Sequence, residues 1–277
     1  MSNFADWFSK IIVINLARRP DRWAHFQAEM EKIGVRLDQY ERFEGYDRPA
    51  EAAGYPEAEP EKHYTNEKAY GWGNTGCTAS HRGVLELIAH NHWARTLVLE
   101  DDAEVIDPKN FAALWAHIET RIPEEWDLLY LGGHYGENPQ ARVNPNILRT
   151  GRMLTTSSYA ITWQMARRMA PFICGTGPID SLFGGFNRAN LCFCFQPRLF
   201  AQYTNVSDIQ NREMNNRMSM TDRYHESLLP YNYVGRFEDY VRPPPRISSG
   251  NVVNPSQHVH NPVRTYSDHP FPTLPNL

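Results

Sequence analysis

The chain has 277 residues, of which 41% are hydrophobic and 22% charged, with a formal net charge of −4 at pH 7. This is ordinary globular composition, which argues against wholesale disorder and allows a sizeable core. The weakly acidic balance gives no electrostatic reason to expect a nucleic acid or an anionic membrane as partner. No stretch reaches the ~18–20 apolar residues of a membrane span, and the N-terminus lacks a signal-peptide pattern. We therefore expect a cytoplasmic protein without a transmembrane segment.

Short apolar runs alternate with helical patterns along the chain. The β-branched run at 11–14 predicts a buried strand. A helix is expected over 22–33, with Pro20 in its first turn and Gly34 after its end. Further strands are expected over 35–43, 96–99, 126–131, 153–162 and 191–195, and further helices over 76–92, 108–122, 164–173 and 178–187.

Strands that alternate with helices predict an α/β domain with a mainly parallel sheet flanked by helices. We expect this domain to span residues 1–222, with an excursion over 48–70 that is rich in Pro and acidic residues. Residues 223–277 are interpreted as a tail or extended arm that covers a site. His258 and His260 in this arm can complete a metal shell when the arm closes, and a disordered tail is the alternative.

The most informative segment is 97–102, where an apolar strand leads directly into Glu100, Asp101 and Asp102. In open α/β sheets, ligands bind beyond the carboxyl ends of the strands. Three adjacent carboxylates repel one another unless a cation offsets their charge. Mg²⁺ and Mn²⁺ take carboxylate oxygens and often keep substrate phosphate as a further ligand. We therefore expect a divalent cation that neutralises a leaving nucleoside diphosphate; a solvated acidic loop is the alternative.

The cysteines give no comparable signal. The chain has four, and no CxxC pairs with a second CxxC or with an HxxxH, so the spacing indicates no zinc site. Cys77 is expected to be a core residue and not a nucleophile, because no paired base is apparent.

An ordered set of short motifs runs from residue 11 to residue 209. The motifs are Val13-Ile14-Asn15-Leu16 with Arg18-Arg19-Pro20-Asp21-Arg22, then 42–45 (Arg-Phe-Glu-Gly), 76–81 (Gly-Cys-Thr-Ala-Ser-His), 99–103 (Leu-Glu-Asp-Asp-Ala), 156–161 (Thr-Ser-Ser-Tyr-Ala-Ile), 178–180 (Pro-Ile-Asp), 197–202 and 207–209. Each motif is weak alone. Together they resemble glycosyltransferase family 25, the lipopolysaccharide-biosynthesis glycosyltransferases and their relatives that galactosylate collagen hydroxylysine. The stretch 48–70 and the chain after Asp222 match nothing in that pattern.

The resemblance implies a GT-A fold, in which a nucleotide-binding α/β domain carries a carboxylate motif for metal and nucleotide. It implies an inverting glycosyltransferase that moves a hexose, most often galactose, from a UDP-sugar to a hydroxyl acceptor. The acceptor can be a glycan, a lipid-linked glycan reached by peripheral contact with the inner membrane face, or a protein.

The resemblance assigns Asp102 to metal coordination, because the family's acidic motif ends there. If extended geometry persists, strand alternation puts Glu100 and Asp102 on one side and Asp101 on the other. Glu100 and Asp102 would then act as a D-x-D pair that holds Mn²⁺ or Mg²⁺. Glu100 and Asp101 are also candidates for a second metal ligand or for the ribose hydroxyls.

Five further residues are candidates for binding the donor. Asn15, Arg18 and Arg22 follow the first strand, and a uracil ring needs amide-like hydrogen bonds while a diphosphate needs cations. The alternative for the arginines is a solvated position at a helix start. Ser80 and His81 are expected near the start of a helix, where exposed N–H groups suit a sugar or phosphate oxygen. Only the family pattern favours His81 as a donor ligand over a structural histidine.

The inverting reaction implied by the resemblance is an in-line displacement, and it needs a general base for the acceptor hydroxyl. Asp180 is the candidate, and a role as helix cap is its alternative. Two other classes of protein stay open. One is another metal-dependent nucleotide enzyme such as a nucleotidyltransferase, which the lack of a Gly-rich phosphate loop disfavours. The other is a non-catalytic carbohydrate- or nucleotide-binding module, which turnover of UDP-sugar to UDP would distinguish from an enzyme.

Overall fold

A computed structural model describes residues 3–47, 71–136, 141–174, 178–203, 205–206 and 213–214. The chain divides into two units, Met1–Val241 and Arg242–Leu277, and the second lies outside the described residues. The domain boundary expected at 222, the excursion over 48–70 and the tail residues His258 and His260 also lie outside them. Those expectations therefore stay predictions.

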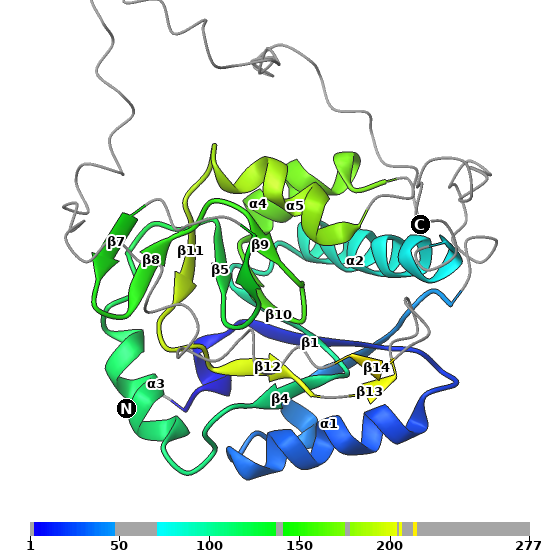
Figure 1. Ribbon diagram of the computed structural model, residues 1–277, viewed down its shortest axis with the longest axis horizontal. Helices are drawn as coiled ribbons and strands as arrows, with labels where there is room; N and C mark the ends of the chain where they lie inside the picture. The colour runs from blue at the N-terminus through cyan, green and yellow to red at the C-terminus, as the bar shows by residue number, and fades with distance from the viewer. Residues whose placement is uncertain are drawn as a thin grey trace, which may run out of the picture. The chain divides into compact units, whose positions relative to one another are not determined.

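An eight-stranded mixed sheet forms the centre of the first unit, in the order β2-β1-β3-β10-β5-β11-β8-β7 (Figure 1). Its strands are β1 (Lys10–Asn15), β2 (Glu41–Glu44), β3 (Thr96–Glu100), β5 (Leu128–Tyr130), β7 (Ala141–Asn144), β8 (Ile147–Arg149), β10 (Ser158–Ile161) and β11 (Cys192–Phe195). β1 pairs in parallel with β2 and β3, and β11 pairs in parallel with β5. β10 and β8 pair antiparallel with their neighbours on both sides. All strands except these two therefore share one direction, which keeps the predicted parallel character but makes the sheet mixed.

Short strand pairs lie outside this sheet. They are β4 (Ala103–Val105) with β12 (Phe200–Gln202), β6 (His134–Tyr135) with β9 (Met153–Leu154), and β13 (Asn205–Val206) with β14 (Glu213–Met214). The expectation of one strand over 153–162 was wrong, because β9 and β10 are separate. Between them Thr155 has a φ of 66°, a left-handed conformation that interrupts an extended strand.

The described helices are α1 (Pro20–Lys32), α2 (Gly71–Asn91), α3 (Phe111–Glu119), α4 (Trp163–Met169) and α5 (Ile179–Asn187). α1 begins at Pro20 and is followed by Gly34 with a φ of 74°, as the pattern of punctuating residues predicts. The strand expected from residue 35 begins only at Glu41, because Leu37–Gln39 form a 3-10 turn. Among the described helices, none has the length and apolar character needed to cross a membrane.

The helices cover opposite faces of the sheet (Figure 1). α1 and α3 share one hydrophobic core with Val13 of β1 and Leu99 of β3. α2, α4 and α5 share the other with Ile12 and Val98 of the same two strands. Consecutive residues of β1 and β3 thus face opposite layers, as the two-residue period of a strand requires. This double burial explains why both strands are almost continuously apolar.

The strand order makes β1 a point of reversal. β2 and β3 lie on opposite sides of β1, and the helices that follow β1 and β2 cover opposite faces of the sheet. This is a topological switch point, and open α/β sheets bind ligands in the crevice beyond the carboxyl ends of the strands at such a point. Asn15 ends β1 and Glu100 ends β3 at this edge.

Candidate active site

The acidic turn after β3 lies directly against the end of β1. The backbone N–H of Asp101 donates to the carbonyl of Ile14 at 3.1 Å. On its other side, the backbone N–H of Tyr203 donates to the carbonyl of Asp102 at 3.1 Å. The carboxylates are therefore placed by main-chain hydrogen bonds at the β1–β3 switch point, which argues against a loosely solvated acidic loop.

Asp101 links β1 and α1 to β3. Its side chain is buried; Asn15 Nδ2 donates to its Oδ2 at 2.6 Å, and Arg22 Nη1 donates to its Oδ1 at 3.0 Å. Burial raises the pKa of Asp101 above its usual value, although Arg22 and Asn15 act to lower it. Both oxygens have protein partners, so Asp101 holds the end of β1 and helix α1 against the turn after β3. The structure thus brings three of the sequence-predicted residues into direct contact.

Asp102 has less positive charge close to it than Asp101 has. Its Oδ2 lies 3.7 Å from Arg22 Nη1, and Gln202 Nε2 donates to its Oδ1 at 3.3 Å. Burial, and then the negative charge of Glu100, raise the pKa of Asp102 to about 7, although Arg22 acts in the opposite direction. A buried carboxylate beside other carboxylates is stabilised by a cation. Carboxylate oxygens of this kind are ligands that hard divalent cations take.

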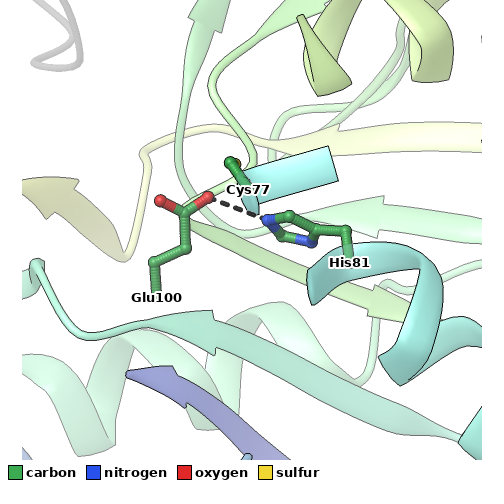
Figure 2. Close-up of side chains that lie close together, drawn as sticks. All are labelled: Cys77, His81 and Glu100. Carbon is green, nitrogen blue, oxygen red and sulfur yellow. Dashed lines mark hydrogen bonds and ion pairs between the residues drawn. The ribbon is translucent and has the colours of Figure 1, made fainter. Parts of the chain in front are cut away.

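Glu100 belongs to a second set of contacts. Its Oε1 accepts a hydrogen bond from Thr156 Oγ1 at 2.9 Å and lies 3.2 Å from Nε2 of His81 (Figure 2). Although burial raises the pKa of Glu100, its interactions with His81 and Thr156 bring that pKa below its usual value. The contacts with His81 and Thr156 therefore favour the ionised form of Glu100.

His81 is buried between α2 and the sheet. Its Nδ1 lies 3.0 Å from the hydroxyl of Tyr159 on β10, while Nε2 faces Glu100. Cys77 lies one helical turn earlier on α2, and the potential ligand atoms of Cys77, His81 and Glu100 all lie within 4.8 Å of one another. This cluster can hold a divalent cation. Cysteine motifs in the sequence do not reveal this cluster, because Cys77 has no second cysteine at metal-binding spacing. The four-residue spacing of Cys77 and His81, which places both on one helix face, was the available signal.

The expectation that Ser80 and His81 lie near a helix start was wrong. α2 already begins at Gly71, so both residues lie in its interior, where backbone N–H groups bond within the helix. Ser80 Oγ accepts from the N–H of Tyr46 at 2.9 Å and donates to the carbonyl of Gly76 at 2.7 Å. Ser80 therefore ties the segment after β2 to α2.

The two arginines that the sequence predicts as donor ligands, Arg18 and Arg22, have different surroundings. Arg22 is buried and pairs with Asp101, so the alternative of a solvated arginine is wrong for this residue. Arg18 leaves 48% of its side chain exposed and donates through Nε and Nη2 to the two carboxylate oxygens of Asp47, at 2.7 and 2.9 Å. Arg18 and Asp47 follow β1 and β2, so a bidentate cation lies at the same edge of the sheet.

Asp180 lies in the first turn of α5. Its Oδ2 accepts from the N–H of Thr155 at 3.3 Å, and its Oδ1 accepts from Ser181 Oγ at 3.3 Å. The carboxylate thereby supports the left-handed residue that precedes Thr156. Its negative charge also contributes to the raised pKa of the Cys77 thiol, for which burial is the main cause. Asp180 thus lies on the α2 side of the acidic edge.

Two residues with contacts to the acids had no predicted role. Thr156 lies 56 residues after its partner Glu100, and Gln202 lies 100 residues after Asp102. Both fall inside segments that resemble family motifs. Their contacts depend on the placement of β10 and β12, which local sequence patterns do not reveal.

The fold and this edge define a mixed α/β domain with a carboxylate-rich site at a topological switch point. A family model described as Glycosyltransferase family 25 (LPS biosynthesis protein) matches residues 8–182. The chain therefore belongs to glycosyltransferase family 25, as the ordered motifs indicated.

Curated relatives extend well beyond this chain. It is 30% identical over 230 residues to the Procollagen lysyl hydroxylase and glycosyltransferase of Acanthamoeba polyphaga mimivirus, with 72% of this chain and 25% of that protein covered. It is 24% identical over 182 residues to a Glycosyltransferase 25 family member of Drosophila melanogaster (62% and 29% covered). It is 26% identical over 178 residues to the Inactive glycosyltransferase 25 family member 3 of Homo sapiens (58% and 28% covered). The chain spans less than a third of the length of each.

Proposed function

We propose that this chain is an active, inverting glycosyltransferase of GT-A type. It transfers a hexose, with galactose as the first candidate, from a UDP-sugar to a hydroxyl acceptor with the help of Mn²⁺ or Mg²⁺. The observation that carries the proposal is the buried pair Asp101 and Asp102 at the β1–β3 switch point, where one arginine, Arg22, lies 3.0 Å from the first and 3.7 Å from the second. The proposal includes a cytoplasmic location and an acceptor on a glycan, a lipid-linked glycan or a protein.

Asn15 is proposed to bind the nucleotide base. Its Oδ1 is buried and has no hydrogen-bond partner among the described residues, while its Nδ2 is held by Asp101 and by the carbonyl of Arg19. A buried acceptor without a partner is costly, so such an atom calls for an explanation. The imide N–H of uracil is a donor that would satisfy it. Arg18 is proposed to exchange Asp47 for the diphosphate, since a guanidinium matches both groups bidentately.

Asp102 and Glu100 are proposed to hold the metal, and Asp101 to position them. A bound Mn²⁺ or Mg²⁺ would supply Lewis-acid stabilisation of the departing nucleoside diphosphate. The all-oxygen donor set of the two carboxylates supports these hard cations. His81 and Ser80 are proposed to position Glu100 and the segment after β2, respectively.

Asp180 is proposed to accept the proton of the attacking hydroxyl. A half-buried carboxylate on the α2 side of the acidic edge is suited to this role. Its hydrogen bonds from Thr155 and Ser181 orient the carboxylate and leave acceptor capacity on its two oxygens.

A second candidate function is a non-catalytic binding module, which the human relative named inactive favours. Release of UDP separates the two functions. The chain would be incubated with UDP-galactose, UDP-glucose, UDP-N-acetylglucosamine or GDP-mannose and Mn²⁺, with a hydroxyl acceptor series. The proposal expects nucleotide release from one UDP-sugar that stops with a chelator and in Asp102→Asn. If a sugar donor binds but no nucleotide is released from any of the four donors, the binding module is favoured.

A further inference from the structure

A sulfur, an imidazole nitrogen and a carboxylate oxygen converge behind the acidic edge. Cys77 and His81 lie four residues apart on α2 and project from one helix face toward Glu100 at the end of β3 (Figure 2). Their ligand atoms lie within 4.8 Å of one another, and His81 Nε2 is 3.2 Å from Glu100 Oε1. This donor set differs from the oxygen-only set proposed for Mn²⁺ or Mg²⁺ at Glu100 and Asp102.

We propose that Cys77, His81 and Glu100 form a Zn²⁺ site, distinct from the proposed Mn²⁺ or Mg²⁺ site and sharing Glu100 with it. Cysteine sulfur, histidine nitrogen and carboxylate oxygen are the ligands that Zn²⁺ uses in proteins. Bond lengths of about 2.1 Å place two tetrahedral ligand atoms about 3.4 Å apart, close to the observed separation of His81 and Glu100. Three protein ligands leave one coordination position open for water or another small ligand.

The imidazole is already oriented for this role. The Tyr159 hydroxyl lies 3.0 Å from His81 Nδ1, while Nε2 points to Glu100. Metal-binding histidines commonly use their second nitrogen in such a hydrogen bond, which fixes the ring and the tautomer. Tyr159 is fully buried, so its hydroxyl cannot swing away to solvent.

The charge around the thiol also favours a cation. A carboxylate oxygen of Glu100 lies within 4.8 Å of the Cys77 sulfur, and the Asp180 carboxylate is hydrogen-bonded to Thr155, next to the Thr156 that contacts Glu100. The same carboxylates attract a divalent cation, and coordination deprotonates a thiol outright. A thiolate ligand selects Zn²⁺ over Mg²⁺ or Mn²⁺, which prefer carboxylates and water.

Because Glu100 belongs to both proposed metal sites, Zn²⁺ binding is expected to affect sugar transfer. This expectation rests on the proposed function. A Zn²⁺ ion bound by Cys77 and His81 draws the Glu100 carboxylate toward α2, so we expect Zn²⁺ to compete with Mn²⁺ for this ligand. Zn²⁺ is therefore expected to inhibit UDP release, and the inhibition is expected to require Cys77.

Binding is tested first, on the full chain stripped of metal with a chelator. Co²⁺, a spectroscopic substitute for Zn²⁺, gives a charge-transfer absorption when a thiolate is a ligand, and the wild type is expected to show it. Zn²⁺ affinity is measured by competition with a chromogenic chelator. Cys77→Ser should remove the absorption and weaken Zn²⁺ binding by about 100-fold or more, since loss of a residue that only supports a metal ligand already costs about 10–100-fold.

Two variants serve as controls. Cys174→Ser removes an exposed free thiol and should leave absorption and affinity unchanged. Asp102→Asn should keep the thiolate absorption, because Asp102 belongs to the other site. Thermal unfolding midpoints identify any variant that fails to fold, and Cys77→Ala then replaces Cys77→Ser.

A wild-type Co²⁺ spectrum without a thiolate band overturns the proposal and needs no variant. A thiolate band or a Zn²⁺ affinity that is unchanged in Cys77→Ser also overturns the proposal. Zn²⁺ binding that depends on His258 and His260 instead of Cys77 is one such result. In the activity assay, Zn²⁺ should inhibit the wild type and Cys174→Ser but spare Cys77→Ser. If the chain releases no UDP at all, the proposed function fails while the binding result still decides the zinc site.

Discussion

Arg22 on α1 and Asp101 after β3 form an ion pair at 3.0 Å with more than nine-tenths of each side chain buried. The pair joins the helix after β1 to the acidic turn, and Arg22 also lies 3.7 Å from Asp102. Arg22 thus places a positive charge next to Asp101 and close to Asp102, and it also acts to lower the pKa of Glu100. Its position explains how a carboxylate-rich turn is kept inside the fold.

Arg22→Ala is expected to lower the free energy of unfolding by about 3–5 kcal/mol, because it leaves a buried carboxylate without its partner. Urea denaturation at pH 7 measures this loss. Arg18→Ala is the matched control, since the half-exposed pair of Arg18 with Asp47 should contribute only about 0–1 kcal/mol. Equal losses in the two variants would contradict the assignment of Arg22 as the buried counter-ion.

The raised pKa of Asp102, about 7 against 3.8 for the free group, predicts a pH-dependent stability. Between about pH 4 and pH 7 the folded state holds a proton that the unfolded state has lost, so the free energy of unfolding falls as pH rises. Arg22 opposes this shift, while Glu100 and Asp101 reinforce it.

The decline is expected to reach a few kcal/mol, at about 1.4 kcal/mol per pKa unit. Chemical denaturation from pH 5 to pH 8 in the presence of a chelator measures it. Asp102→Asn should flatten the dependence, and Mn²⁺ should restore stability above pH 7. A wild type whose stability rises steadily across this range would show that Asp102 is already ionised and sufficiently paired.

Gly76 marks a close approach between α2 and the segment after β2. A Cβ at this position would lie 2.4 Å from the carbonyl oxygen of Tyr46, a backbone atom that cannot rotate away. Gly76→Ala is therefore expected to destabilise the fold by about 1–3 kcal/mol, the usual cost of overpacking. Gly185→Ala is the control, because a Cβ there meets nothing within 4 Å and alanine favours a helix by about 1 kcal/mol. The thermal unfolding midpoint should fall in Gly76→Ala and rise in Gly185→Ala.

Asp180→Asn tests the proposed base. Loss of a general base should lower kcat about 10²–10⁴-fold, while the Kd for the UDP-sugar stays within about twofold because donor contacts remain. Single-turnover UDP release and calorimetric donor binding measure the two quantities. Ser181→Ala, which removes the hydrogen bond to Asp180 and the one accepted from Arg152 but keeps the Asp180 carboxylate, should have a much smaller effect. A parallel loss of donor affinity in Asp180→Asn would instead assign Asp180 to positioning of the donor.

The local parts of the fold follow from local sequence. Pro20 and Gly34 mark the limits of α1, because one lacks an N–H that the first turn does not need and the other adopts a positive φ. The apolar runs of β1 and β3 predict doubly buried strands. The direction and order of strands in the sheet cannot be predicted in this way. The antiparallel placement of β10 between β3 and β5 depends on partners far apart in the chain, and a short apolar run does not indicate the direction of its strand.

The candidate site also has parts that the sequence predicts and parts that depend on contacts between distant segments. Asn15 and Asp101 could be placed at one edge because both follow parallel strands, and the 2.6 Å contact between them agrees with that reasoning. Sequence reasoning placed Ser80 and His81 at a helix start, because Gly76 resembles a helix boundary; instead Gly76 provides close packing inside α2. Cys77 received no role, because its partner Glu100 lies on another element.

Donor-dependent thermal stabilisation is the most direct test of the central claim, that the acidic edge after β3 binds a nucleotide sugar through a divalent cation. The unfolding midpoint is measured for the wild type and Asp102→Ala with UDP-galactose, other nucleotide sugars and ATP, each with and without Mn²⁺. A ligand that binds only the folded state stabilises it and so raises the unfolding midpoint. At a ligand concentration of 100 times the Kd, the free energy of unfolding increases by about 2.7 kcal/mol. The account predicts a Mn²⁺-dependent rise with one UDP-sugar that is lost in Asp102→Ala. No rise with any nucleotide sugar, or an equal rise in the variant, would contradict it.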